Sequence, residues 1–73
     1  MTSIVLRVRL ISGDQLDVTY EEEGGADDVV VGHAVAALSG DSGTLRCKHG
    51  NRLLVLYARG VAALEIAPRG AVL

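Results

Sequence analysis

The sequence predicts a small α+β domain in the order β-β-α-β-β-β, with one short helix on one face of a five-stranded, mostly antiparallel sheet. Two observations lead to this fold class. Apolar and polar residues alternate with period 2 near the start of the chain and again after residue 43, as they do in half-buried strands. Between these parts, residues 28–39 carry apolar side chains at helical spacing. A chain of 73 residues has room for one domain, which we expect to span residues 1–73.

The first two strands are predicted over residues 4–10 and 16–20, which are separated by the turn-forming run Ser-Gly-Asp-Gln. The apolar face of this hairpin comprises Ile4, Leu6, Val8, Leu10, Leu16, Val18 and Tyr20. Arg7 and Arg9 lie on the other face. Depending on the register, one of these arginines would lie opposite an acidic residue or Thr19, in a cross-strand pair worth at most about 1 kcal/mol.

The helix is predicted over residues 28–39, with a length of about ten residues. Its apolar stripe comprises Val30, Val31, Ala34, Val35 and Leu38. Asp27 or Asp28 is placed to cap its first turn, and Gly40 is placed to end it. Three consecutive valines and Gly32 lower the helix propensity of this segment, so a strand over the same residues is the alternative.

The rest of the chain predicts three further strands in a meander. Residues 44–49 alternate in polarity, and the Gly-Asn pair at 50–51 suits a tight turn into the apolar segment 53–57. A second turn at 59–60 leads to a strand that ends at Pro68, because proline cannot continue a ladder. The segment 53–57 has no polar face, so it should be a central strand covered on both sides or lie at an oligomer interface.

The order of hairpin, helix and strands, together with the chain length, resembles that of ubiquitin-like β-grasp domains. A β-grasp-like topology is therefore one expected form of the sheet. The chain ends in Ala-Pro-Arg-Gly-Ala-Val-Leu, without the exposed Gly-Gly terminus used for conjugation or sulfur transfer, so no motif extends the resemblance beyond element order. An all-β small barrel is the alternative fold class.

Charge divides the chain into two halves of opposite sign. Residues 1–45 carry two arginines and eight acidic residues, a net charge of −6. Residues 46–73 carry five basic residues and one acidic residue, a net charge of +4. Such halves attract each other within one molecule or across an interface, and a partner that meets only the basic half experiences a positive field.

Several features point to a cytoplasmic protein. The single cysteine, Cys47, cannot form an internal disulfide, and no apolar signal segment follows Met1. The longest apolar run is far shorter than the roughly 20 residues of a membrane helix, so we expect no membrane association. Six arginines against one lysine, with abundant alanine, valine and glycine, are typical of a high-GC bacterial genome.

Cys47, His49 and His33 are the residues that a metal site would use. A structural zinc site needs four ligands, and the usual short-spaced cysteine pairs do not occur in this sequence. Cys47 and His49 share one face of a strand, but neighbours two residues apart lie roughly 6 to 7 Å from each other, too far for a nucleophile and its base. We therefore predict no metal, no cofactor and no enzymatic activity, with a Cys/His metal site or enzyme as the least favoured alternative.

A basic hairpin offers a second candidate function, which is weak binding of nucleic acid. Arg46 and Lys48 share the polar face of one strand, and the turn after them brings Arg52 alongside. However, only Tyr57 is nearby to stack on a base, and the pI of the whole chain is about 5.5. We therefore keep nucleic acid as a possible but not favoured partner.

The favoured function is a non-enzymatic interaction module, an adaptor or regulatory accessory protein. One helix covers one face of a sheet, so a second apolar face in the meander would need a partner, most simply a second copy in a homodimer, or else another protein. The predicted core of this interface is Leu54, Leu56, Val61 and Ala63. Its predicted rim is Arg52 and Arg59.

Overall fold

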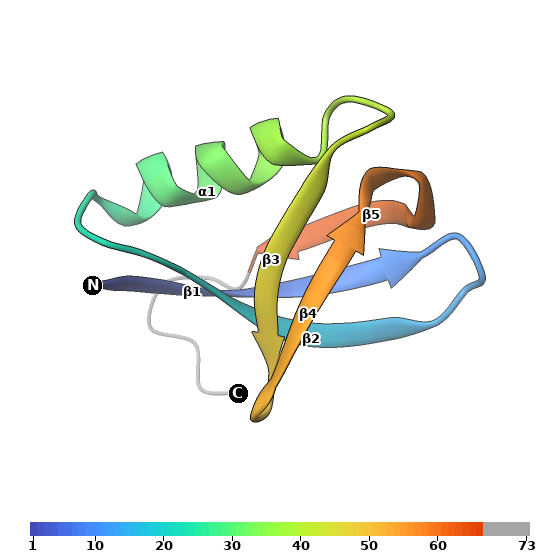
Figure 1. The fold of residues 1–73 in the computed structure, drawn as a ribbon, viewed down its shortest axis with the longest axis horizontal. Coiled ribbons are helices and arrows are strands. Elements are labelled where there is room, and N and C mark those ends of the chain that lie inside the picture. Colours follow the sequence, from blue (N-terminus) through green and yellow to red (C-terminus); the bar gives the residue numbers. More distant parts are fainter. Residues whose placement is uncertain (67–73) are drawn as a thin grey trace.

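The computed structural model describes residues 1–66 and contains five strands, one α-helix and one 3₁₀ turn (Figure 1). The elements are β1 (Thr2–Leu10), β2 (Gln15–Glu22), α1 (Asp27–Ala37), β3 (Thr44–His49), β4 (Arg52–Tyr57), η1 (Ala58–Gly60) and β5 (Val61–Ile66). The α+β class and the element order are confirmed. The all-β alternative and a strand over residues 28–39 are wrong, because α1 is helical. The predicted strand end at Pro68 lies outside the described residues.

All strand pairs in the sheet are antiparallel, and the strand order is β4-β3-β2-β1-β5. The predicted meander of the last three strands is wrong, because β5 pairs with β1 and not with β4. The turn η1 carries the chain from one edge of the sheet to the other, where Ile11 N–H donates to the Gly60 carbonyl. This order does not confirm the β-grasp resemblance, and it makes β4 and β5 the two edge strands.

The hydrophobic core lies between the inner face of the sheet and α1 (Figure 1). It comprises Ile4, Leu6, Val8, Val18, Val30, Ala34, Leu45, Cys47 and Leu56. The alternation predicted for the first hairpin is confirmed, because β1 buries Ile4, Leu6 and Val8 while Arg7 and Arg9 are exposed. The register places Arg7 opposite Asp17, which selects one of the cross-strand pairs that the sequence left open.

The helix α1 packs on β1, β2 and β3 through the buried Val30 and Ala34, and the partly buried Val31 and Leu38 also pack against the core, so the predicted stripe is confirmed at these four positions. Val35, predicted on the same stripe, is 49% exposed. The predicted aspartate cap is wrong. Ala26 is the N-cap and provides no side-chain hydrogen bond, while Asp27 and Asp28 lie in the first turn, where carboxylates favour the positive end of the helix dipole.

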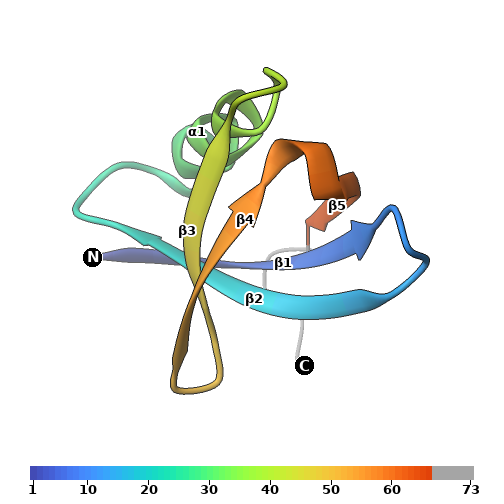
Figure 2. The same ribbon diagram turned by 45° about the vertical axis from the view of Figure 1, so that its right-hand side comes forward.

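The β3–β4 hairpin runs steeply across β1 and β2 (Figure 2). Only one pair of residues, Thr19 and Lys48, joins β2 to β3, so the two hairpins diverge from this point. The hairpin closes through Gly50 and Asn51, between the paired residues His49 and Arg52. Gly50 has φ of +63°, as a glycine does at the first central position of a type II′ turn.

Candidate interaction surface

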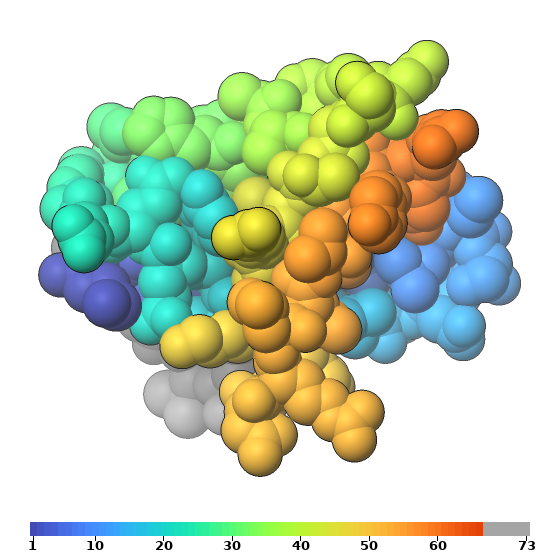
Figure 3. Space-filling view, in the orientation of Figure 1, coloured from blue at the N-terminus to red at the C-terminus, as the bar shows by residue number. Residues whose placement is uncertain are grey.

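The edge strand β4 exposes apolar side chains on its outer face. Leu53 is 67% exposed, Val55 41% and Tyr57 63%. We call these three residues the β4 strip. The two leucines between them face inward, since Leu56 is buried and Leu54 packs against the core. Figure 3 shows β4, in orange, lying uncovered across the front of the molecule next to β3.

The backbone N–H and C=O groups of the β4 strip are directed toward the free edge of the sheet. Ala58 N–H donates to the Gly43 carbonyl at 2.9 Å, which places residues 58 and 43 in a hydrogen-bonded pair. Hydrogen-bonded and non-bonded pairs alternate along an antiparallel ladder. With the observed register, Leu54 and Leu56 therefore bond to β3, while the N–H and C=O groups of the β4 strip are directed away from β3.

Basic side chains border the β4 strip. Arg46 lies opposite Val55, and Lys48 lies opposite Leu53, so both share the outer face of the hairpin. Lys48 Nζ forms an ion pair with Glu21 Oε1 at 3.2 Å. Within residues 1–66, no ion pair involves Arg46 or the two arginines at the ends of β4, Arg52 and Arg59.

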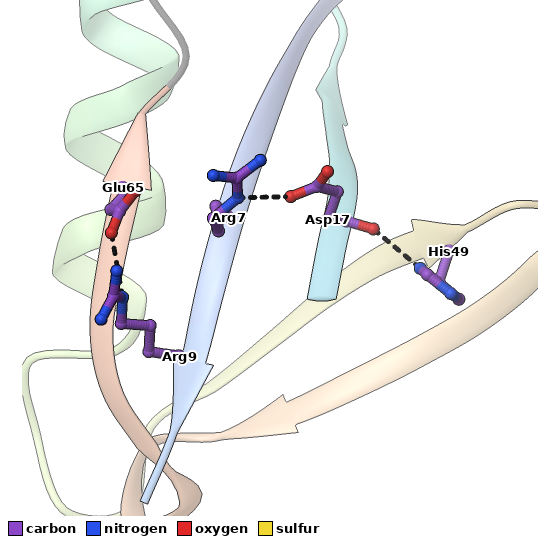
Figure 4. Close-up of polar contacts among 5 residues, drawn as sticks. All are labelled: Arg7, Arg9, Asp17, His49 and Glu65. Carbon is purple, nitrogen blue, oxygen red and sulfur yellow. Dashed lines mark hydrogen bonds and ion pairs between the residues drawn. The ribbon is translucent and has the colours of Figure 1, made fainter. Parts of the chain in front are cut away.

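The outer face formed by β2, β1 and β5 is polar and its charges are paired (Figure 4). Arg7 Nε donates to Asp17 Oδ1 at 3.1 Å, and Arg9 Nε donates to Glu65 Oε1 at 2.9 Å. The hydrogen bond with Asp17 is the main reason that the pKa of Arg7 is raised. The second apolar face expected from the sequence is therefore confined to β4 within this sheet.

A shallow hollow opens where the two hairpins diverge. It is lined by Arg7, Gln15, Leu16, Asp17 and His49. His49 Nδ1 lies 2.7 Å from the Asp17 carbonyl oxygen (Figure 4). A carbonyl only accepts, so Nδ1 carries the proton and donates it. This contact joins β3 to β2 beyond the last backbone pair, which is a structural role for His49.

The residues considered for a metal site do not come together. Within residues 1–66, no group of three His, Cys, Asp or Glu side chains is placed to hold a metal ion. Cys47 is buried in the core, and this burial raises the pKa of its thiol. A raised pKa disfavours the thiolate, which is the reactive and metal-binding form.

Sequence reasoning missed a cluster that ties the end of β2 to α1. The Tyr20 hydroxyl donates to Glu22 Oε2, and His33 Nδ1 lies 2.7 Å from Glu22 Oε1. The hydrogen bond with Glu22 raises the pKa of Tyr20 to about 12. The Tyr20 bond, followed by the His33 bond, lowers the pKa of Glu22. The only signal in the sequence was that Tyr20 and Glu22 share a strand face.

The six residues predicted for the interface do not form one surface. Leu54 and Leu56 lie on the inner face of β4. Val61 packs against the core and Ala63 is exposed, but both are on β5, at the opposite edge of the sheet. The exposed apolar residues of β4 are those of the β4 strip, which the sequence reasoning did not choose.

Comparisons with known proteins do not assign the chain to a family. Protein families, curated proteins and solved structures return no match. Along residues 1–66, no helix has the length and apolar character needed to cross a bilayer.

Proposed function

We propose that the protein is a non-enzymatic interaction module that self-associates through the free edge of β4 and serves as an adaptor or regulatory accessory protein. The observation that carries this proposal is the β4 strip, which presents apolar side chains and free backbone groups at the same three positions. An exposed apolar edge strand is a template for pairing with another chain. Native proteins usually blunt such edges, so an edge left open favours a binding role.

Two copies can pair through β4 in an antiparallel, two-fold arrangement centred on Val55. In this register Val55 lies opposite Val55 of the other copy, and Leu53 lies opposite Tyr57. The three outward-directed residues of each copy would then form roughly six hydrogen bonds between the chains, two for each bonded pair. Because an isologous contact uses the same patch twice, this pairing closes as a dimer.

The other functions considered from the sequence have less support. Of the three cations proposed to bind nucleic acid, Lys48 already pairs with Glu21. Arg46, Arg52 and the exposed Tyr57 keep that alternative as the second candidate. The residues considered for a metal site do not come together within residues 1–66, and an enzyme or metal site stays the least favoured alternative. A cytoplasmic location stays a prediction.

Sedimentation velocity at increasing protein concentration tests the proposed function. Wild-type protein should show a concentration-dependent dimer, and Val55→Lys should remain monomeric because it places a charge at the centre of the contact. Val29→Lys is the matched control, since Val29 is similarly exposed (48%) but lies on α1. A monomer at every concentration, or equal loss of the dimer in both variants, would contradict the proposal.

A charge introduced at Leu54 is expected to affect the stability of the fold, not the β4 contact between copies. Leu54 packs against the core from the inner face of β4. Leu54→Lys should therefore lower the free energy of unfolding, which urea denaturation measures, whereas Val55→Lys should leave it within about 0.5 kcal/mol of wild type.

A further inference from the structure

From the charges around β4 we infer that its preferred partner is an acidic, extended segment of another protein, which adds to the sheet as a sixth strand. This inference rests on the proposed function of β4 as an interaction edge, and it names the chemistry of the partner. Recognition of this kind uses backbone hydrogen bonds for affinity and alternate side chains for specificity.

The distribution of ion pairs supports an acidic partner. Arg7, Arg9 and Lys48 each pair with a carboxylate on the outer face of the sheet. In contrast, three arginines form no ion pair among residues 1–66: Arg46 beside Val55 on the outer face, Arg52 at the start of β4 and Arg59 in η1. Among residues 1–66, these unpaired arginines therefore lie on β4, beside it on β3 and just after it, next to its exposed apolar side chains. A partner strand with carboxylates would complement this charge and be steered toward it.

A second copy of the chain complements the edge less well. In the two-fold register centred on Val55, Arg52 lies opposite Ala58 of the other copy and next to its Arg59. Each end of the paired strands therefore carries Arg52 of one copy and, just beyond β4, Arg59 of the other, and like charges at this spacing repel. An acidic strand replaces these repulsions with attractions while keeping the same backbone hydrogen bonds. We therefore expect an acidic strand to displace the second copy.

The positions of the exposed groups define the sequence of the added strand. Its apolar residues occur at every second position, so that they lie beside Leu53, Val55 and Tyr57 on the outer face. Its carboxylates occupy the positions between them and at both ends, within reach of Arg52 and Arg59. A strand of about six or seven residues matches the length of β4.

Fluorescence anisotropy with dye-labelled peptides tests the inference. The probes are three seven-residue peptides in which valine alternates with glutamate, with threonine or with lysine. Wild-type protein should bind the glutamate peptide at least about tenfold more tightly than the lysine peptide, with threonine between them. The glutamate peptide should bind more weakly at high salt and should dissociate the wild-type dimer. Self-association should instead strengthen with salt, because salt screens the arginine repulsion.

Two variants separate the charge preference from the strand pairing. Arg52→Glu/Arg59→Glu should reverse the order of the peptides, so that the lysine peptide binds best. Val55→Pro should bind none of them. Its N–H points away from β3, so proline keeps the ladder of β4 while removing a donor and crowding the free edge. Circular dichroism checks that this variant folds, and if it does not, the charge reversal alone decides the test.

Each remaining outcome gives a definite result. Equal binding of the three peptides, abolished by Val55→Pro, would overturn the acidic preference and leave the proposed function standing. If no peptide binds while the protein still forms a concentration-dependent dimer, the acidic partner is contradicted and the proposed self-association stands. An oligothymidylate bound as tightly as the glutamate peptide, with both unaffected by Val55→Pro, would show that the cations bind polyanions without strand addition.

Discussion

Gly43, between α1 and β3, is the residue whose identity the packing constrains most directly. A Cβ atom at this position would lie 2.0 Å from the Ala37 carbonyl oxygen, which belongs to the helix backbone. The contact cannot be relieved by rotating a side chain. Only glycine lets the end of α1 and the start of β3 approach this closely.

Gly43→Ala should therefore lower the free energy of unfolding by roughly 1 to 3 kcal/mol, the cost typical of overpacking. Gly40→Ala, in the same loop, is the control, because nothing lies within 4 Å of a Cβ there and its φ is not positive. Urea denaturation of the two variants measures the difference. Equal stability of both would show that the loop shifts freely.

Because of Tyr20, the free energy of unfolding should depend on pH in the alkaline range. Its pKa is raised from 10.0 to about 12 by the hydrogen bond with Glu22, followed by burial. A raised folded-state pKa means that the contribution of the neutral hydroxyl is complete below pH 10 and is lost as the pH rises to about 12. Glu22 acts in the opposite direction, since its lowered pKa gives a contribution that is lost as the pH falls through the acid range.

Tyr20→Phe should remove the alkaline part of this dependence. The free energy of unfolding of the wild type should fall more steeply between pH 10 and 12 than that of Tyr20→Phe. Tyr57→Phe is the control, because the Tyr57 hydroxyl is exposed and makes no hydrogen bond to the described residues. If the slopes of wild type and Tyr20→Phe coincide, the bond to Glu22 does not persist in solution.

At the scale of the elements, α1 begins without a side-chain cap. Ala26 has the extended backbone of an N-cap residue (φ −81°, ψ 158°) but no side chain that accepts a hydrogen bond. Ala26→Ser should therefore raise the free energy of unfolding by about 0.5 to 2 kcal/mol. Ala36→Ser, at an exposed position inside the helix, should bring no such gain. Thermal unfolding followed by circular dichroism compares them, and equal midpoints would contradict the proposed cap position.

The sequence was sufficient to predict the strands and the helix, but not the neighbours of each strand. Period-2 alternation identifies a strand and its faces from local residues alone. The pairing of β5 with β1 joins segments more than fifty residues apart, and no local pattern encodes it. The meander was predicted because consecutive strands usually pair. This choice also made β4 a central strand, whereas the structure places it at the edge.

The inner face of β4 was predictable from the turn that precedes it. Because β4 is apolar on both faces, its own alternation could not distinguish Leu54 and Leu56 from the β4 strip. A two-residue turn at Gly50 and Asn51, however, pairs His49 with Arg52 and so Cys47 with Leu54. Directly paired residues share a face. Leu54 therefore had to lie on the same face as Cys47, inside the fold.

At the scale of the whole molecule, the two oppositely charged halves of the sequence meet across the sheet. Lys48 of the basic half pairs with Glu21 of the acidic half, so part of the charge asymmetry is neutralised inside one molecule. Of the arginines in residues 1–66, those without an ion pair are Arg46 on β3, Arg52 at the start of β4 and Arg59 just after it. Within residues 1–66, the protein therefore combines a polar sheet face whose charges pair internally with the apolar edge strand β4 and its nearby unpaired arginines, and this combination is the basis of the proposed binding role.

The central claim is that β4 is an open edge which becomes paired when the protein binds. Amide hydrogen exchange, read residue by residue by NMR, tests it most directly. In the monomer, the Leu54 and Leu56 amides should be protected and those of Leu53, Val55 and Tyr57 should exchange rapidly. On dimerisation, or with the glutamate peptide, the second set should become protected while the first set changes little. Protection of Val55 in the monomer, or its rapid exchange in the complex, would contradict the claim.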